Sequence, residues 1–337
     1  MRFLVTGASG FIGSRLAQDL SERFGRTNVQ LLFPPAPKHA KENRRQDELV
    51  SAGYDIVYQD LLNLPVDFSK KIKPFDVLYH LAAFGETESR NVALNDVNDI
   101  GTKNLLQALS DHLNDARVVF VSTLAAVDRL HSDNTPMGED YPCRPRTAYG
   151  VSKLNAEAIV KNEAARLGYK WTIMRLSTVI GAGYRPGGLL DAIDESLRRK
   201  SLFARLNWPG RIELVHVNDV SEILAEASTV PLPDNALFHL SSGIAPTLDE
   251  LIDQAARLLQ VKRRRIVLPS FFWTLLNRLI WMPGLYYRLP FDFKLLLWRL
   301  SLILTDGFVG NGALLSRTIP HRFMGLEEIG RASCRER

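Results

Sequence analysis

Cysteine is scarce in this chain, which contains only Cys143 and Cys334 among 337 residues. Two thiols are too few for a disulfide framework or a cysteine-ligated metal centre. The seven histidines show no spacing typical of metal ligands, so we expect no metal site. The first residues, MRFLVTGASG, lead directly into an apolar strand and leave no room for a secretory signal. These absences favour a cytoplasmic protein.

Long uninterrupted apolar runs are also missing. Residues 266–304 are rich in leucine and aromatic side chains, but charged residues interrupt them at Arg278, Arg288, Asp292, Lys294 and Arg299. No run approaches the roughly 18 to 20 apolar residues that a spanning helix needs, so we expect no transmembrane segment. Two interpretations stay open: helices that wall a substrate cleft, or an interfacial helix that meets a membrane or a hydrophobic substrate. Exposed Trp and Phe side chains would favour the second.

Positive charge is in modest excess, with a formal net charge of +5. The Lys and Arg residues are scattered rather than gathered into one basic tract, and no basic stripe with interleaved aromatic residues is present. We therefore expect a small-molecule substrate and no nucleic-acid partner. A content of 46% hydrophobic and 23% charged residues is typical of a globular protein.

Short apolar runs alternate with longer amphipathic stretches through the first half of the chain. This alternation predicts an α/β fold with a doubly wound parallel sheet of the Rossmann type, whose buried strands are apolar on both faces. The expected strands are Phe3–Thr6, Val29–Phe33, Ile56–Tyr58, Val77–Leu81, Val118–Ser122 and Thr172–Leu176. The expected helices between them include Ser14–Phe24, Val97–Leu109 and Tyr149–Leu167.

Glycine- and proline-rich loops become frequent after Gly181, and they indicate a second, smaller region. We expect residues 1–178 to form the dinucleotide-binding domain, with 212–240 returning to it through strands at Leu214–Val217 and Leu237–Leu240. Residues 179–211 and 241–327 would form an interleaved, mostly helical substrate-binding region, with one helix opened by the capping-box pattern Thr247-x-x-Glu250. Residues 328–337 (EIGRASCRER) resemble a translated sequencing adapter, so we expect a non-native tail.

A glycine-rich turn follows the first expected strand and opens the first expected helix. Gly7, Gly10 and Gly13 form the pattern G-x-x-G-x-x-G, which allows backbone N–H groups to approach a pyrophosphate at the positive end of a helix. The strand–turn–helix context makes this a candidate dinucleotide site. The intervening cofactor-binding candidates are Ser9, Phe11 and Ile12.

The residues after the second strand report on the cofactor, because a carboxylate there binds the ribose of NAD whereas a cation accommodates the 2′-phosphate of NADP. This chain has Phe33-Pro34-Pro35 at that place, with no acid, and Lys38, Arg44 and Arg45 follow. The cations could equally be solvated charges on a helix. We expect NAD or NADP, and the missing carboxylate favours NADP.

Further motifs run in order along residues 1–260: TGASGFIG at 6–13, QDLL at 59–62, HLAA at 80–83, NDIGTKNLL at 98–106, VSTLAA at 121–126, YGVSK at 149–153 and VHVNDV at 215–220. Together they resemble the extended short-chain dehydrogenase/reductase superfamily, in its NAD-dependent epimerase/dehydratase family. The resemblance implies that Asp60 and Leu61 contact the adenine and that Asn98 holds a helix and a water near the catalytic lysine. It also implies a homodimer. The residues that would line the cofactor groove are Leu81, Ala82 and Ala83.

Tyr149 and Lys153 are the candidate catalytic pair. Residues four apart lie on the same helical face, so the ammonium can sit near the phenol. A nearby cation stabilises the phenolate and lowers the pKa of a tyrosine from its usual value near 10, which makes it a general acid/base. Lys153 should also bind the nicotinamide ribose. A hydroxyl from the end of the fifth strand should polarise the reacting oxygen, and we assign it to Thr123, with Ser122 as the alternative.

Two reactions and one non-catalytic role fit these residues. The stretch Ser-Thr-Leu-Ala-Ala and the apolar C-terminal helices resemble hydroxysteroid dehydrogenases and dihydroflavonol-type reductases, so we favour an NAD(P)-dependent oxidoreductase that interconverts an alcohol and a ketone on a small, hydrophobic substrate. Sugar 4,6-dehydratases carry Asp-Glu where this chain has Leu124 and Ala125. The first alternative is a nucleotide-sugar epimerase. The second, a non-catalytic NAD(P)-binding protein, is disfavoured because both Tyr149 and Lys153 are present.

Overall fold

Seven parallel strands form the central sheet of the computed structural model, which describes residues 1–37, 40–85, 96–128, 135–184, 188–280 and 290–335. The strand order is β3-β2-β1-β4-β5-β6-β9. Strands β2 and β3 therefore lie on one side of β1 and the later strands on the other, so the order switches between β1 and β4. This confirms the predicted doubly wound α/β fold. The strands are β1 (Phe3–Thr6), β2 (Val29–Phe33), β3 (Asp55–Tyr58), β4 (Val77–His80), β5 (Arg117–Thr123), β6 (Lys170–Leu176) and β9 (Ala236–Leu240).

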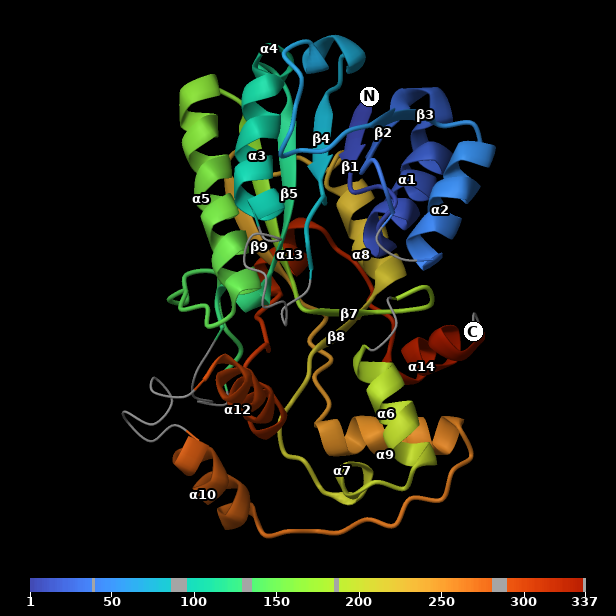
Figure 1. Cartoon of the computed structure of the whole chain (residues 1–337), viewed down its shortest axis with the longest axis vertical. Helices are drawn as coiled ribbons and strands as arrows, with labels where there is room; N and C mark the ends of the chain where they lie inside the picture. Colours follow the sequence, from blue (N-terminus) through green and yellow to red (C-terminus); the bar gives the residue numbers. More distant parts are fainter. Residues whose placement is uncertain (38–39, 86–95, 129–134, 185–187, 281–289, 336–337) are drawn as a thin grey trace.

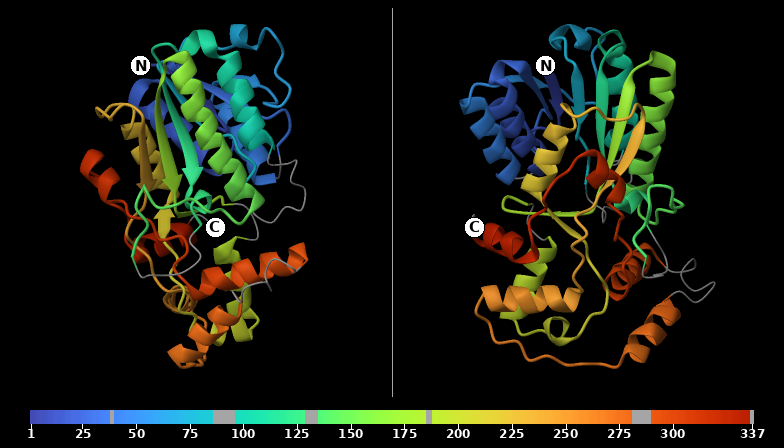
Figure 2. Two further views of the ribbon diagram at one scale, coloured as in Figure 1. Left: turned by 90° about the vertical axis from the view of Figure 1, so that its left-hand side faces the viewer. Right: turned by 180° about the vertical axis from the view of Figure 1, so that it is seen from behind.

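Helices cover both faces of this sheet (Figures 1 and 2). The apolar strands are buried on both sides, which is why they read as continuous apolar runs. One core contains residues of α1, α2 and α8, and the core on the other face contains residues of α3 and α5. These helices are α1 (Phe11–Phe24), α2 (Ala40–Ser51), α3 (Asp96–Ala108), α5 (Ala148–Leu167) and α8 (Val217–Glu226), and short turns lie at α4 (Ser110–Leu113), η1 (Arg26–Asn28) and η2 (Phe68–Lys71).

The segment 212–240 returns to the main domain only in part. As predicted, β9 joins the sheet beside β6. The expected strand Leu214–Val217 does not: β8 (Leu214–His216) pairs with β7 (Thr178–Ile180) in a separate two-stranded sheet. The edge of β6 is already occupied by β9. Because β7 follows β6 after a single residue, β7 extends beyond the main sheet, and its edge is available to pair with β8.

The second region lies beyond the carboxyl ends of the strands and is mostly helical (Figure 1). The capping box is present, because Thr247 Oγ1 accepts a hydrogen bond from Glu250 N while Glu250 Oε2 accepts one from Thr247 N at 2.8 Å. One helix, α13, instead packs against the main core through Leu315 and Ile319. The remaining elements are α6 (Leu189–Arg198), α7 (Leu202–Arg205), α9 (Leu248–Leu258), α10 (Ser270–Ile280), α12 (Phe291–Leu304), α13 (Ala313–Thr318) and α14 (Leu326–Arg335).

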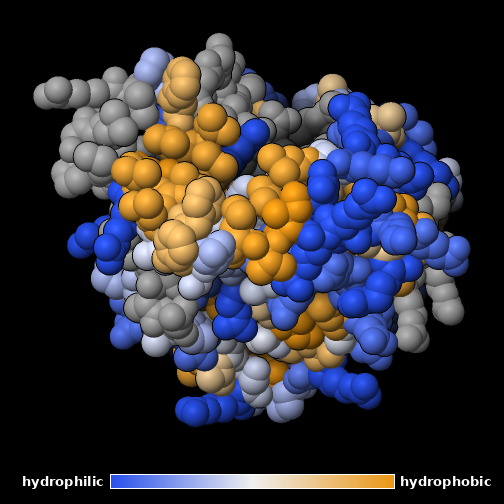
Figure 3. Space-filling model, turned by 90° about the horizontal axis from the view of Figure 1, so that it is seen from below, coloured by the Kyte–Doolittle hydropathy of each residue, from blue (hydrophilic) through white to orange (hydrophobic). Residues whose placement is uncertain are grey.

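The second region contains the C-terminal segment that the sequence marks as non-native and the leucine-rich helices that it marks as too polar to span a membrane. Residues 328–335 belong to α14, and Ile329 is buried in the core of the second region, while the non-native origin of this segment stays a prediction. Among the described residues no helix is both long enough and apolar enough to cross a membrane. Apolar side chains nevertheless form a continuous area on the surface at this end of the molecule (Figure 3).

Candidate active site

The glycine-rich turn lies between β1 and α1 and packs against the end of β4. Gly7 has a positive φ of 68°, and a Cβ atom there would come within 2.6 Å of Ala82 N. A Cβ atom on Gly13 would overlap Gly7 O. Among the described residues, no side chain caps α1 at Gly10, and its first turn, which starts with Phe11 and Ile12, contains no acid. The turn is therefore compact, and the first backbone N–H groups of α1 fit a pyrophosphate.

Side chains from α2 contact this turn, which the sequence did not predict. Ser9 is buried, and its Oγ donates a hydrogen bond of 2.8 Å to Glu42 Oε1. Arg45 Nε donates to Ser9 O at 2.8 Å. Arg44 instead pairs with Glu48 at the surface, and Lys38 lies outside the described residues. A carboxylate is thus present at the turn, although the sequence has none directly after β2.

The groove-lining candidates Leu81, Ala82 and Ala83 follow β4 and are half-buried. Ala82 N donates a hydrogen bond of 3.2 Å to Thr6 Oγ1. His80 is fully buried, and its ring nitrogens lie 2.7 Å from Thr6 Oγ1 and 2.8 Å from Thr102 Oγ1. Burial, assisted by Lys153, lowers the pKa of His80 to about 3. A neutral histidine therefore links the groove to α3.

Asn98 on α3 connects the loop after β4 to α5. Its Nδ2 donates hydrogen bonds to Ser152 Oγ at 2.9 Å and to Phe84 O at 3.1 Å, and its Oδ1 accepts one from Phe84 N at 2.6 Å. Ser152 immediately precedes Lys153. Asn98 is therefore suited to a positioning role, and its predicted contact with a water stays a prediction.

Asp60 and Leu61 follow β3, two strands from β1 and on the side away from α5. Asp60 accepts hydrogen bonds from Leu62 N at 3.0 Å and from Asn63 Nδ2 at 2.7 Å, so its carboxylate stabilises its own turn. Leu61 is buried in the core beneath α3. This location lies at the β3 edge of the sheet, and adenine binding there stays a prediction.

Tyr149 lies in the first turn of α5, and Lys153 lies one turn later. The helix begins at Thr147, whose Oγ1 accepts a hydrogen bond of 3.0 Å from Gly150 N. A Cβ atom on Gly150 would overlap Ala125 O in η4 (Leu124–Ala126), the turn directly after β5. The glycine of the YGVSK motif thus lets α5 approach the end of β5 closely, which brings the segment of Tyr149 beside that of Thr123.

Lys153 is fully buried. Its Nζ donates a hydrogen bond of 2.7 Å to Val121 O and lies 4.0 Å from the centre of the Phe120 ring. Burial lowers the pKa of Lys153 to about 7, and the nearby Glu157 carboxylate opposes this change. The site therefore holds a lysine whose charge is poised near neutral pH.

The two hydroxyl candidates have different surroundings. Ser122 is buried and donates a hydrogen bond of 2.5 Å to Glu157 Oε1. Glu157 also forms a buried ion pair with Arg175, at 2.9 and 2.7 Å. Thr123 is only half-buried and accepts a hydrogen bond from Ala125 N, which leaves its own proton for a further acceptor. This geometry favours Thr123 over Ser122 as the polarising hydroxyl.

The loop after β7 brings the second region against the cofactor turn. The rings of Phe11 and Tyr184 meet edge to face at 5.3 Å, and Arg45 Nη1 donates to Gly183 O at 3.0 Å. His216 ends β8 and caps α8. The glycine turn, the loop after β4 and the start of α5 thus lie at the carboxyl ends of the neighbouring strands β1, β4 and β5.

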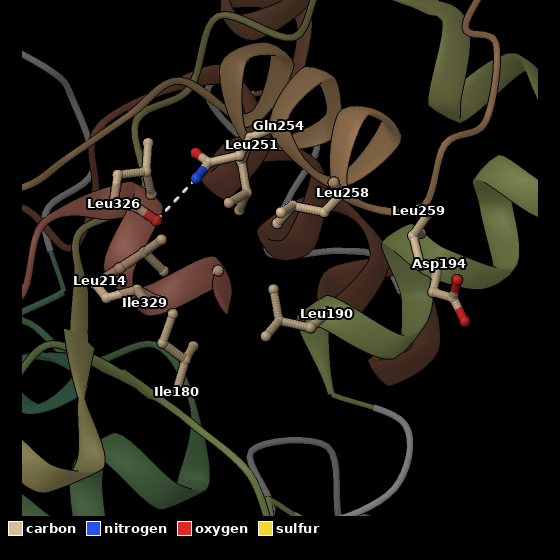
Figure 4. Close-up of a pocket in the computed structure, with 12 residues that line it drawn as sticks. Ile180, Leu190, Asp194, Leu214, Leu251, Gln254, Leu258, Leu259, Leu326 and Ile329 are labelled. Atoms are coloured by element: carbon tan, nitrogen blue, oxygen red, sulfur yellow. Dashed lines mark hydrogen bonds between the residues drawn. The ribbon is translucent and has the colours of Figure 1, made fainter. Parts of the chain in front are cut away.

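An apolar pocket of about 70 Å³ lies elsewhere in the second region, between α6, α9 and α14 (Figure 4). Leu190, Leu251 and Ile329 are among its walls. Gln254 Nε2 donates a hydrogen bond of 2.8 Å to Leu326 O, which joins α9 to α14. Neither Tyr149 nor Lys153 lines this pocket, so it is separate from the catalytic candidates.

Comparisons with known proteins agree with this geometry. The model of the NAD dependent epimerase/dehydratase family matches residues 3–232. A putative UDP-glucose 4-epimerase of Methanocaldococcus jannaschii is 27% identical over 260 residues, which cover 74% of this chain and 80% of that protein. The mitochondrial L-threonine 3-dehydrogenase of Bos taurus is 28% identical over 246 residues, covering 68% of this chain and 61% of that protein.

Solved structures share the fold over the whole chain. The UDP-glucuronic acid 4-epimerase of Bacillus cereus in complex with NAD is 18% identical, with a TM-score of 0.77 and coverage of 100% of this chain and 96% of that one. The Thermus thermophilus UDP-glucose 4-epimerase in complex with NAD is 21% identical, with a TM-score of 0.74 and coverage of 100% and 98%. The chain therefore belongs to the NAD dependent epimerase/dehydratase family and is an enzyme of the extended short-chain dehydrogenase/reductase type.

Proposed function

We propose that the chain is an NAD-dependent nucleotide-sugar 4-epimerase that acts on a UDP-hexose or UDP-hexuronic acid. The observation that carries this proposal is the packing of Gly150 against η4, which sets the segment of Tyr149 beside that of Thr123. Relatives named as UDP-glucose 4-epimerases, and solved 4-epimerases with the same fold, favour this reaction over our initial interpretation of simple alcohol/ketone redox. Membership of this family, together with the presence of both Tyr149 and Lys153, favours a catalytic role over the non-catalytic alternative.

NAD is the cofactor that we propose. The compact glycine turn and the uncapped start of α1 would hold its pyrophosphate, and Lys153 would hold its nicotinamide ribose. Glu42 brings a carboxylate to the Ser9 hydroxyl, which suits a ribose hydroxyl better than a 2′-phosphate. The preference for NADP that the sequence suggested is therefore not part of the proposal. The homodimer stays a prediction from the family resemblance.

The residues divide the chemistry between them. Bound NAD supplies a reversible hydride acceptor for the sugar carbon. Tyr149 would take the proton from the sugar hydroxyl and later return it, while Lys153, one helical turn away, favours the phenolate form. Thr123 would donate a hydrogen bond to the same sugar oxygen. For epimerisation the keto sugar would have to rotate within the site, so that hydride returns to the opposite face of the carbon and the proton returns to the oxygen. The second region therefore has to retain the nucleotide while the sugar rotates.

A second candidate, oxidation of a free alcohol, is supported by the L-threonine 3-dehydrogenase relatives. The chain also has Leu124 where some sugar epimerases carry a serine, and the residues after β6 lack the Tyr-Gly-Pro turn of many sugar-nucleotide enzymes. These departures bear on the substrate rather than on the roles of Tyr149 and Lys153.

One assay separates the two reactions. The enzyme is incubated with NAD and UDP-glucose, UDP-galactose or UDP-glucuronic acid, and the sugars are separated by chromatography while absorbance of reduced cofactor is followed. Epimerisation yields the 4-epimer without net reduction of NAD, whereas alcohol oxidation accumulates reduced cofactor. Tyr149→Phe should lower kcat by about 10²- to 10⁴-fold with little change in NAD affinity. Full activity in Tyr149→Phe would contradict the mechanism.

A further inference from the structure

An exposed apolar surface lies on α10, on α12 and on the segment before α10. We name it the α10–α12 face. Phe271 is 70% exposed and Val267 66%, values far above those of core residues. Seen from that end, the molecule presents a continuous apolar area (Figure 3). The members of the face are Val267, Phe271, Phe272, Leu275, Leu279, Phe293 and Leu296.

The helix α10 is apolar on two sides. Its inner side buries Trp273 and Ile280 in the core of the second region. Its outer side carries Phe271, Leu275 and Leu279, which are spaced by four residues and therefore form one stripe. A surface helix ordinarily has a polar outer side, and exposed apolar areas of this kind mark contact sites. The α10–α12 face is therefore a candidate contact site.

Positive charge is in excess in the part of the sequence that carries this face. Residues 262–299 hold eight of the 42 Lys and Arg residues but only one of the 37 acids, so this stretch is more positive than the entire chain at +5. The sequence interpretation of scattered charge overlooked this local excess. Lys262, Arg264 and Arg278 are exposed. Arg263 and Arg265 are different, because acids on α9 neutralise them: Arg263 forms ion pairs with Asp249 and Asp253, and Arg265 pairs with Asp249.

We propose that the α10–α12 face docks the enzyme on a membrane surface that contains anionic lipids. Exposed Phe and Leu side chains enter the boundary between headgroups and acyl chains, and the surrounding Lys and Arg side chains bind the lipid phosphates. A second copy of the chain fits less well, because a two-fold contact would bring Arg278 and its neighbouring cations against the same residues of the partner. The charge therefore selects a lipid surface.

The proposed docking surface is connected to the catalytic segment. Trp298 lies on α12, and its Nε1 donates a hydrogen bond of 3.3 Å to Asp128 Oδ2. Asp128 forms a buried ion pair with Arg146, at 2.5 and 3.0 Å. Arg146 directly precedes Thr147, which caps the helix of Tyr149. Docking would therefore hold the start of α5 close to the lipid surface. The docking proposal does not depend on which substrate the enzyme uses.

Vesicle flotation of the full chain tests the proposal. We expect binding to vesicles of phosphatidylcholine with about one third phosphatidylglycerol, and weak binding to phosphatidylcholine alone. Phe271→Glu/Leu275→Glu should abolish binding. Lys262→Gln/Arg264→Gln/Arg278→Gln should weaken it by about 100-fold, since each cation near an anionic surface contributes about fivefold. Val66→Glu, at a fully exposed apolar residue in the loop after β3, is the matched control and should bind as wild type.

Circular dichroism and melting temperature verify that each variant is folded, and the changed side chains are exposed. Binding by wild type and by Val66→Glu that both other variants lose supports the proposal. Absence of binding to anionic vesicles, or binding that persists in Phe271→Glu/Leu275→Glu, overturns it. Sedimentation velocity tests whether a second copy of the chain covers the face instead. If the wild type is an oligomer that does not bind vesicles, and Phe271→Glu/Leu275→Glu is a monomer, the face belongs to a second copy and the membrane proposal is overturned.

Discussion

Replacing Lys153 by methionine should inactivate the enzyme and yet stabilise the cofactor-free fold near neutral pH. Burial lowers the pKa of Lys153 from 10.5 to about 7. A change of tenfold in proton affinity corresponds to about 1.4 kcal/mol, so burying this lysine costs about 4 kcal/mol at pH 7. Methionine has a similar length and no charge, but it gives up the hydrogen bond to Val121 O and the contact with Phe120. We expect a net gain of roughly 1 to 3 kcal/mol.

The stability difference between Lys153→Met and the wild type should depend on pH. Between about pH 7 and 10.5 the unfolded chain binds the proton that folded Lys153 has released, so the free energy of unfolding of the wild type rises with pH through this window. Lys153→Met lacks this contribution, and its advantage should shrink by about 4 kcal/mol as the pH rises from 7 to 10.5. Urea unfolding across this range measures both curves. Lys161→Met, on the same helix, controls for the loss of a lysine.

Two outcomes would refute the reasoning. In the first, the free energies of unfolding of Lys153→Met and of the wild type differ by a constant amount from pH 7 to 10.5, which would mean that Lys153 keeps its charge when folded. In the second, Lys153→Met is less stable than the wild type at pH 7, which would mean that the contacts with Val121 and Phe120 outweigh the burial of charge.

Three further substitutions test individual packing and hydrogen-bond assignments. Gly150→Ala should lower kcat by about 100-fold and lower the melting temperature, because its Cβ overlaps Ala125 O and displaces α5, whereas Val151→Ala on the exposed side of the same turn should do neither. Thr123→Ala should reduce kcat with little loss of stability, while Ser122→Ala should mainly lower the free energy of unfolding, by about 1 to 3 kcal/mol, because it removes a donor to buried Glu157. Glu42→Gln should shift the ratio of dissociation constants toward NADP in fluorescence titrations, and Arg44→Gln should not.

The fold was predictable from the sequence where local pattern and burial agree. Short apolar runs gave all seven strands of the main sheet within two residues of their bounds, because strands covered on both faces need apolar side chains throughout. The strand β8 was misplaced because its three residues pair with β7, and so short a segment carries no periodicity that identifies its partner. Strand pairing is decided by which edge is free, and only the structure gives that.

The candidate site was predictable to the same extent. The glycine turn and the Tyr149–Lys153 pair were found because their spacing within one turn or one helix is fixed by local geometry. Glu42 and Glu157 were missed because each meets its partner across a long sequence separation, at Ser9 and Arg175. The sequence already favoured Thr123 over Ser122, but the structural reason, that Glu157 faces Ser122, could not be read from it.

The position of α12 bears on how this site can be completed. The family motifs run along residues 1–260, yet Trp298 reaches Asp128, next to the turn that orients the start of α5. A buried carboxylate that binds Arg146 leaves oxygens that need a further donor, and the indole N–H supplies one. The C-terminal region is therefore linked by a hydrogen bond to the segment that leads into α5. Because the outer side of the same helix carries Phe293 and Leu296, whatever covers the α10–α12 face also constrains the segment that positions Tyr149.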